Sequence, residues 1–271
     1  MTNPSAKKFV QATHGRVAYE EAGRGRPILF LHGMNGSTRS WAEQLDGLSD
    51  TFRVISWDAP GFGESDPCAA SLEAYAQAAR ELMAGLDLRE AIVVGHSMGG
   101  LVATRLGADR GGRIAGIVLS STHLGYARPP GEPLMERYAG RMNHIMAHGA
   151  GPDYGRTSAG KMVPADSSEK VLAALTAVAA GARAEGMRDA GRALQEARNG
   201  EIAPLMDVPV ALFIGGRDPV VKPDQLRGLR EAFPQASQTV FPLAGHASYV
   251  EYPELYNEAL RAFAATLPPL R

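Results

Sequence analysis

Short apolar runs rich in valine, isoleucine and leucine recur along the first 120 residues, and amphipathic stretches separate them. Such runs favour buried strands, whereas apolar positions three or four residues apart favour helices. Two runs flank a His14-Gly15 turn and predict a hairpin with strands at 9–13 and 17–20. Further strands are predicted at 27–31, 54–57, 91–94 and 114–119, with helices at 41–48 and 72–86. Strands that alternate with helices are typical of a parallel sheet covered by helices.

The alternation stops after Ser120 and returns only at Val210. Most of the intervening stretch is alanine-rich, helical in pattern and interrupted by glycine and proline. The sequence Asp-Ser-Ser-Glu at 166–169 has the spacing of a helix start, and Asn199-Gly200 is suited to end another helix. We therefore expect a core domain of residues 1–122 and 205–271, and a helical insertion of residues 123–204.

Residues 91–100 read Ala-Ile-Val-Val-Gly-His-Ser-Met-Gly-Gly, and they combine a strand, a sharp turn and the start of a helix. A serine at such a turn has a strained backbone, so the positions two before and two after it must be small. Gly95 and Gly99 meet that requirement. The turn exposes the hydroxyl of Ser97 beside the N–H groups of the new helix, which suits nucleophilic attack on a carbonyl.

A serine hydroxyl needs a histidine as base, and the histidine needs a carboxylate to hold it. His246 follows a short strand and a glycine turn, and it is the candidate base. Asp218 follows the apolar run that begins at Val210, and Asp58 follows another strand. We rank Asp218 first because proteins with this kind of serine turn have their catalytic residues in the order Ser, Asp, His along the chain. Asp58 is expected to accept N–H bonds within its own turn.

Acyl transfer also needs two N–H groups that stabilise the oxyanion. Met98, directly after Ser97, is expected to provide one of them. Met34, in the His-Gly-Met-Asn-Gly loop after the strand at 27–31, is expected to provide the other, and Gly33 allows close approach of that loop.

The motifs together resemble those of the α/β-hydrolase superfamily, from about Arg16 to Ala264. The matching pieces are His-Gly at 32–33, Asp-Ala-Pro-Gly-Phe-Gly-Glu-Ser at 58–65, Gly-His-Ser-Met-Gly-Gly at 95–100, Gly-Arg-Asp at 216–218 and Gly-His at 245–246. The resemblance implies a mostly parallel eight-stranded sheet with helices on both faces and a helical lid at the insertion. It also implies Ser97 as nucleophile, His246 as base and Asp218 as the carboxylate that orients it.

The insertion contains methionines that are suited to line an apolar pocket, although packing of the lid on the core would use them equally well. We expect Met142 and Met146 to contact substrate, together with Gly33 and His96 near the nucleophile. His144 and His148 are spaced to share a helix face, but no third ligand accompanies them, so we expect no metal site.

A serine nucleophile argues against the dehalogenases and epoxide hydrolases of this fold, which use aspartate. Cofactor-free haloperoxidases tend to have a proline in the oxyanion loop, where this chain has Met34 and Asn35. The sequence most resembles small carboxylesterases and enol-lactonases, which implies cleavage of a small ester or lactone through an acyl-enzyme, without a cofactor.

Two other functions stay open. Hydrolases that cleave a C–C bond in meta-cleavage products have a similar stretch at 58–66, but they usually have Asn before the serine and Trp after the histidine. They also need an arginine in the lid that binds the carboxylate of the substrate. Arg183, Arg188 and Arg192 are candidates for this role. A ligand receptor with an intact triad and slow turnover is the second alternative.

Composition adds mainly exclusions. The chain has 271 residues, 45% of them hydrophobic, and a formal net charge of −1, which gives no reason to expect binding to nucleic acid or to an anionic membrane. Cys68 is the single cysteine, so no intrachain disulfide can form, and we interpret it as an incidental thiol. No signal peptide or membrane-spanning run is apparent, so we expect a soluble cytoplasmic protein with a small carbonyl compound as its partner. The oligomeric state is left open.

Overall fold

The structure, a computed structural model, describes residues 7–109 and 111–270. The first six residues of the N-terminal segment considered above for a signal peptide lie outside these ranges. The described chain forms an eight-stranded sheet in the order β1-β2-β4-β3-β5-β6-β7-β8. The strands are β1 (Lys8–Ala12), β2 (Gly15–Ala22), β3 (Pro27–Leu31), β4 (Arg53–Trp57), β5 (Ala91–His96), β6 (Ile114–Ser120), β7 (Val210–Gly215) and β8 (Ser237–Phe241).

Pairings of the first two strands are antiparallel, and all other pairings are parallel. The hairpin of β1 and β2 joins the sheet at β4 in antiparallel register, whereas β4, β3, β5, β6, β7 and β8 pair in parallel. The mostly parallel sheet predicted from the sequence is confirmed, including the hairpin. Because parallel strands end at the same edge, the turns after β3, β5, β7 and β8 lie together at one side of the sheet.

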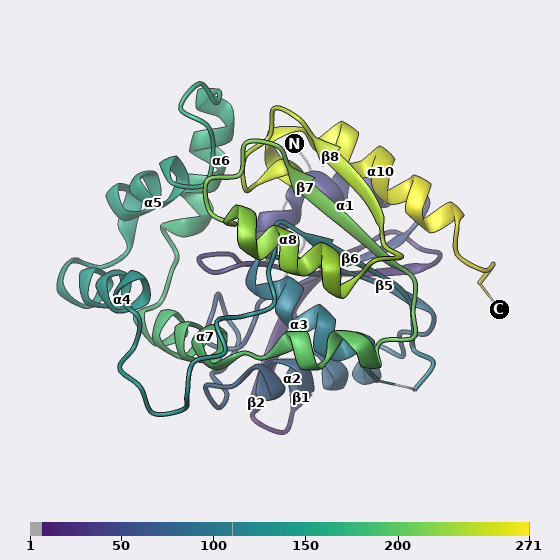
Figure 1. The fold of residues 1–271 in the computed structure, drawn as a ribbon, viewed down its shortest axis with the longest axis horizontal. Helices are drawn as coiled ribbons and strands as arrows, with labels where there is room; N and C mark the ends of the chain where they lie inside the picture. Colours follow the sequence, from purple (N-terminus) through teal and green to yellow (C-terminus); the bar gives the residue numbers. More distant parts are fainter. Residues whose placement is uncertain (1–6, 110, 271) are drawn as a thin grey trace.

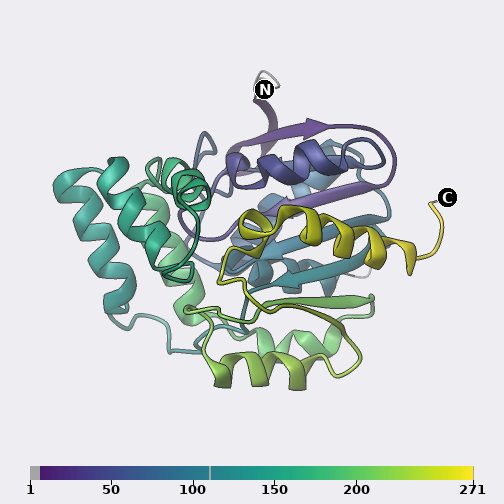
Figure 2. The same ribbon diagram turned by 90° about the horizontal axis from the view of Figure 1, so that it is seen from above.

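Helices cover both faces of the sheet (Figures 1 and 2). The core helices are η1 (Thr38–Trp41), α1 (Ala42–Leu48), α2 (Leu72–Gly85), α3 (Met98–Gly107), α8 (Pro223–Ala232), α9 (Ser248–Glu251) and α10 (Pro253–Ala265). Side chains of a strand alternate between the two faces. In β3, Leu29 and Leu31 accordingly pack in the cluster that includes α2, α3 and α8, whereas Ile28 and Phe30 pack in the cluster with α1 and α10. These two clusters bury the two faces of the sheet beneath its helices.

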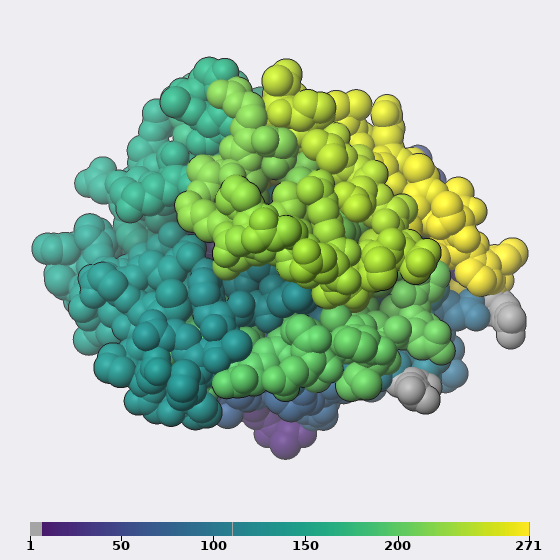
Figure 3. Space-filling model, viewed as in Figure 1, coloured from purple at the N-terminus to yellow at the C-terminus, as the bar shows by residue number. Residues whose placement is uncertain are grey.

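Four helices lie between β6 and β7 in the chain. They are α4 (Glu136–His148), α5 (Gly151–Gly160), α6 (Glu169–Ala179) and α7 (Ala184–Glu196), and two short turns of 3₁₀ helix follow, η2 (Asn199–Glu201) and η3 (Ala203–Leu205). Figures 1 and 2 show α4, α5 and α6 gathered at one end of the molecule, in teal, and Figure 3 shows this end packed against the yellow-green residues that follow β7. The expectation that residues 123–204 act as a lid stays a prediction.

The signals for helix ends within this insertion had different outcomes. Ser168 caps α6, and its hydroxyl accepts a hydrogen bond from the N–H of Val171 at 3.4 Å. Asn199 does not end α7, which stops at Glu196. Its buried side chain instead donates to the carbonyl of Leu101 at 2.8 Å and so ties the insertion to α3.

Candidate active site

Ser97 stands at the junction of β5 and α3 with a strained backbone, φ 51° and ψ −114°. Non-glycine residues in such regions of φ/ψ space cost on the order of 1–3 kcal/mol each. The neighbouring glycines make this conformation possible: a Cβ on Gly99 would lie 2.0 Å from the carbonyl oxygen of Leu31, and one on Gly95 would lie 2.3 Å from that of Gly99. The N–H of Ser97 also donates to the carbonyl of Ser120 on the next strand at 3.0 Å. The turn therefore has the strand–turn–helix geometry predicted for it, and it holds Ser97 at the end of the sheet.

His246 and Asp218 meet at the same edge of the sheet. The Nδ1 atom of His246 lies 2.9 Å from Oδ2 of Asp218, and both side chains are almost fully buried. The other carboxylate oxygen of Asp218 accepts N–H bonds from Val220 at 2.7 Å and Val221 at 3.1 Å. Burial alone would raise the pKa of Asp218, but the attraction of His246 and these hydrogen bonds outweigh it and lower the pKa. An ionised Asp218 accepts a hydrogen bond from the N–H at Nδ1 of His246, and this fixes the tautomer in which Nε2 is able to accept a proton.

The backbone around His246 is fixed from several sides. Its N–H donates to the carbonyl of Met162, between α5 and α6, at 2.7 Å. Its carbonyl accepts a hydrogen bond from Nε2 of His96 at 2.9 Å. The carboxylate of Glu251 accepts the N–H groups on either side, those of Gly245 at 2.9 Å and Ala247 at 3.1 Å. Sequence reasoning missed Met162 and Glu251 as positioning residues, because nothing in the sequence indicates which carbonyl or carboxylate reaches a loop.

The tautomer of His96 follows from its contacts. A carbonyl oxygen can only accept, so Nε2 carries the proton and Nδ1 carries a lone pair, which is buried and has no hydrogen-bond partner among the described residues. Burial, reinforced by the nearby His246, lowers the pKa of His96 to about 3. His96 is therefore neutral at physiological pH, and besides lining the cavity it supports the backbone of His246.

The loop after β3 lies directly against the serine turn. A Cβ on Gly33 would come within 2.8 Å of Nδ1 of His96 and 3.1 Å of Cβ of Ser97, so only glycine fits there without displacement. His32 holds this loop from behind: its Nε2 accepts the N–H of Ala59 at 2.9 Å, so the proton is on Nδ1, which donates to the carbonyl of Gly33 at 2.7 Å. The carbonyl and N–H of one peptide point in opposite directions. Since the carbonyl of the 33–34 peptide faces His32, the N–H of Met34 faces away from it.

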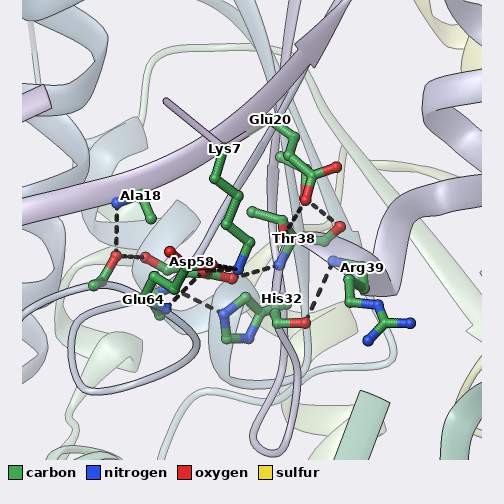
Figure 4. A network of polar contacts seen from close by, with 12 residues as sticks. Lys7, Ala18, Glu20, His32, Thr38, Arg39, Asp58 and Glu64 are labelled. Carbon is green, nitrogen blue, oxygen red and sulfur yellow. Dashed lines mark hydrogen bonds and ion pairs between the residues drawn. The ribbon is translucent and has the colours of Figure 1, made fainter. Parts of the chain in front are cut away.

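Asp58, the second candidate for the acid, lies in a different network (Figure 4). Its carboxylate accepts the N–H groups of Thr38 at 2.7 Å and Glu64 at 2.9 Å, and it pairs with Nζ of Lys7 at 2.7 Å. Thr38 in turn donates its hydroxyl to Glu20 at 2.7 Å. Asp58 thus braces the turn after β4 and the start of η1, behind the loop that His32 supports.

Ser97 and His246 line the same narrow cavity, with a volume of about 50 Å³, together with Met34 and His96. A second and mainly apolar cavity of about 80 Å³ lies between the loop after β3 and α6. The residues that line both cavities are Met34, Asn35, His96 and Met162. Of the residues expected to bind substrate, His96 lines both cavities and Gly33 lines the second one, and their contact with substrate stays a prediction.

Met142 and Met146, the two methionines of the insertion that were expected at the pocket, lie elsewhere. Met146 is 71% exposed on α4, and Met142 packs in a small cluster with Ile145, Tyr154 and Met187. Neither lines the cavity that contains Ser97. The expectation that they contact substrate is not supported by this geometry, because the turn of α4 directs one side chain outward and the other into the packing of the insertion itself.

The three arginines that were considered as binding groups for a substrate carboxylate do not line the cavity that contains Ser97, and each has another partner. Arg183 donates to the carbonyl of Ser65, Arg188 pairs with Asp189, and Arg192 pairs with Glu196.

Two further sequence features lie apart from the serine. The rings of His144 and His148 are 5.1 Å apart, and within the described ranges no group of three or more His, Cys, Asp or Glu residues is placed to hold a metal ion. Burial raises the pKa of Cys68 to about 12, so its thiol is not a thiolate nucleophile at neutral pH. Across the described residues, no helix is long and apolar enough to cross a membrane.

Comparison with known proteins agrees with this geometry. A family model described as alpha/beta hydrolase fold matches residues 26–253. The chain belongs to this family, which supports a hydrolase acting on a small molecule. Over 267 residues it is 28% identical to the dihydrolipoyllysine-residue acetyltransferase component of the acetoin cleaving system of Cupriavidus necator, covering 95% of this chain and 68% of that protein.

Solved structures share the fold over nearly their whole length. An enol-lactonase from Burkholderia xenovorans LB400 superposes with a TM-score of 0.84 at 24% identity, covering 95% of this chain and 100% of that one. A thermophilic esterase from Thermogutta terrifontis superposes with a TM-score of 0.83 at 26% identity, covering 97% and 99% of the two chains.

Proposed function

We propose that this protein is a serine hydrolase that cleaves a small ester or lactone through an acyl-enzyme. One observation carries the proposal: Ser97, on a strained turn, lines the same cavity as His246, whose Nδ1 is held 2.9 Å from the Asp218 carboxylate. A nucleophile, a base and a group that orients the base are the minimum that this chemistry needs. The esterase of Thermogutta terrifontis, similar along the whole chain, supports an ester as the substrate.

In the first half of the reaction, Oγ of Ser97 attacks the carbonyl carbon while Nε2 of His246 takes the hydroxyl proton. The charge that develops on the imidazole is stabilised by Asp218, whose low pKa keeps it ionised. The protonated His246 then gives its proton to the leaving alcohol. In the second half, His246 activates a water that attacks the acyl-enzyme, and Ser97 leaves with the returned proton.

Both tetrahedral intermediates carry a negative oxygen. We assign its stabilisation to the N–H of Met98, in the first turn of α3, and to the N–H of Met34, which faces away from His32. The first N–H groups of a helix have no partner within the helix, and the helix dipole adds to their attraction for an anion. A single donor of this kind typically contributes about 3 kcal/mol to the transition state.

The proposal is tested with the 4-nitrophenyl esters of acetate, butyrate and octanoate. Ser97→Ala should abolish turnover while the far-UV circular dichroism stays unchanged, and Ser237→Ala, at an exposed position of β8, serves as the matched control and should keep full activity. A fluorophosphonate probe should label Ser97 in the wild type, as located by mass spectrometry. Hydrolysis that persists in Ser97→Ala, or labelling of another residue, contradicts the proposal.

The two alternative functions, cleavage of a C–C bond and a slow ligand receptor, predict different results with the same set of 4-nitrophenyl esters. If the wild type turns over none of the esters, a 2-hydroxy-6-oxo-dienoate tests cleavage of a C–C bond. If it forms an acyl-enzyme that releases product far more slowly than the roughly 1–1000 per second common among enzymes, the receptor function is favoured. Incorporation of ¹⁸O from water into the released acid distinguishes hydrolysis from acyl transfer to another acceptor.

A further inference from the structure

The arginines of the insertion fall into two groups. Most of them have an acidic partner within 4.0 Å, in the pairs Arg128–Glu132, Arg156–Glu169, Arg183–Glu185, Arg188–Asp189, Arg192–Glu196 and Arg198–Glu201. Arg137 and Arg141 on α4 form no ion pair with any described residue. A guanidinium is always charged at physiological pH, so these two carry positive charge that the protein itself leaves uncompensated.

Both unpaired arginines line the cavity that contains Ser97 and His246. No Asp or Glu is among the described residues that line it, and the nearby carboxylate of Asp218 is already bonded to His246. Like charges four residues apart on a helix repel each other, at a cost of a few tenths of a kcal/mol. The placement of two cations in one cavity is therefore slightly unfavourable until an anion arrives.

The side chain of Arg137 is exposed to solvent and lies over two tyrosine rings. Its guanidinium carbon lies 5.7 Å from the ring centre of Tyr126 and 5.4 Å from that of Tyr138, and its Nη1 donates to the hydroxyl of Tyr126 at 2.5 Å. A guanidinium has five N–H donors, and this contact uses one of them. The remaining donors can form a bidentate pair of hydrogen bonds with a carboxylate. Arg141, one turn further along the helix, is half-buried beside it.

We propose that the substrate carries a carboxylate, which Arg137 and Arg141 bind while Ser97 attacks the ester or lactone carbonyl. This inference rests on the proposed function and narrows its substrate class. The second cavity offers a place for an apolar part of the substrate, because Leu175 and Val178 of α6 contribute to its lining. It adjoins the first cavity at Met34 and His96. The substrate therefore has an anionic end toward α4 and an apolar end toward α6, with the cleaved bond between them.

The test compares substrates that differ only in charge. One pair has the charge on the acyl side, mono-4-nitrophenyl adipate against its neutral methyl ester, and the other has it on the leaving group, 4-acetoxybenzoate against methyl 4-acetoxybenzoate. In at least one pair, the wild type should prefer the anion by about tenfold or more in kcat/KM, which corresponds to about 1.4 kcal/mol at 25 °C. Added salt should reduce the preference, since it screens charges at the exposed mouth of the cavity.

Variants then assign the preference to the two arginines. Arg137→Gln combined with Arg141→Gln should bring the ratio close to one, mainly through a higher KM for the anion, while the neutral ester changes by less than about threefold. Replacement of both by Lys should restore part of the preference, which shows that the Gln variant is folded and that charge is the cause. Arg128→Gln, which removes an arginine already paired with Glu132, is the matched control and should leave the ratio unchanged.

The possible failures are distinguishable. If esters are hydrolysed without preference for the anion in either pair, or if the Gln variant keeps the preference, the inference is overturned and the proposed function stands. If no ester is hydrolysed, the proposed function fails, and calorimetric titration of adipate into the wild type and the double Gln variant still tests the anion site. Equal affinity of the two proteins for adipate, or no binding by either, would overturn it.

Discussion

His32 offers a way to separate the support of the oxyanion loop from the stability of the fold, because its two ring nitrogens do different things. Nδ1 donates to the carbonyl of Gly33, and Nε2 accepts the N–H of Ala59. Asparagine places an amide near the position of Nδ1, and glutamine places one near the position of Nε2. His32→Asn therefore keeps the donor to Gly33 and loses the acceptor for Ala59, whereas His32→Gln does the reverse.

The expected magnitudes follow from what each change leaves unpaired. His32 is fully buried, so in His32→Asn the N–H of Ala59 loses its partner, and a buried unsatisfied group costs about 1–3 kcal/mol. In His32→Gln the carbonyl of Gly33 still accepts the N–H of Gly36 at 3.0 Å, so the loss of stability should be smaller. Its peptide plane, however, is less fixed, and partial loss of a donor worth about 3 kcal/mol predicts a fall in kcat of about ten- to a hundredfold.

The assay measures kcat and KM with 4-nitrophenyl butyrate, and the free energy of unfolding from urea titrations. The crossed result, with lower stability in His32→Asn and lower kcat in His32→Gln, is the expected outcome. If both variants lose stability and kcat in the same proportion, the ring acts as packing alone. A His32→Gln enzyme with unchanged kcat would refute the assignment of Met34 as an oxyanion donor that His32 orients.

Three further expectations concern the groups around the serine. Asp218→Asn should stay folded and lose about 10⁴-fold in kcat, because the amide favours the wrong tautomer of His246; a nearly silent Asp218→Asn beside an inactive Asp58→Asn would contradict the choice of acid. Gly33→Ala should lower kcat/KM at least about tenfold, because its methyl group meets His96 Nδ1 at 2.8 Å; unchanged kinetics would show that the loop yields freely. For His96 the folded-state pKa of about 3 lies below the unfolded value, so the unfolded state binds the proton first and stability falls as the pH drops from 6.5 toward 3. Urea titrations between pH 7 and 4 should show a fall in stability that is shallower in His96→Gln, by up to about 1.4 kcal/mol per pH unit, and equal slopes would contradict it.

The sheet and the serine turn could be predicted from the sequence because both depend on local patterns. A strand with both faces buried needs a continuous apolar run, such as the one that became β5, and the turn after it needs small residues at 95 and 99. The His–Asp contact was predictable only through the order of the motifs along the chain. The structure places these two side chains 2.9 Å apart from loops after different strands.

The insertion was harder to interpret for a physical reason. Periodicity predicts that a helix has an apolar side, but not which neighbour that side meets. On α4 the arginines at 137 and 141 line the cavity, Met142 packs within the insertion and Met146 faces outward, so the methionines expected at the pocket are not there. The bonds of Glu251 and Met162 around His246 join segments far apart in the chain and have no sequence signal.

The chain leaves the sheet after β6 and rejoins it at β7, and these two strands are direct neighbours, with Ile117 paired with Val210. The whole helical insertion is therefore one connection between adjacent parallel strands, which begins at the carboxyl end of β6 and ends at the amino end of β7. Because the entropy of closing a loop grows only logarithmically, by about 0.6 kcal/mol for each doubling of its length, the segment between these strands can lengthen, shorten or be exchanged at little thermodynamic cost to the sheet. Substrate preference can thus diverge among descendants of one gene while the serine, its base and its acid stay in register, provided that the exchanged segment still supplies the contacts that Met162 makes with His246 and that Asn199 makes with α3.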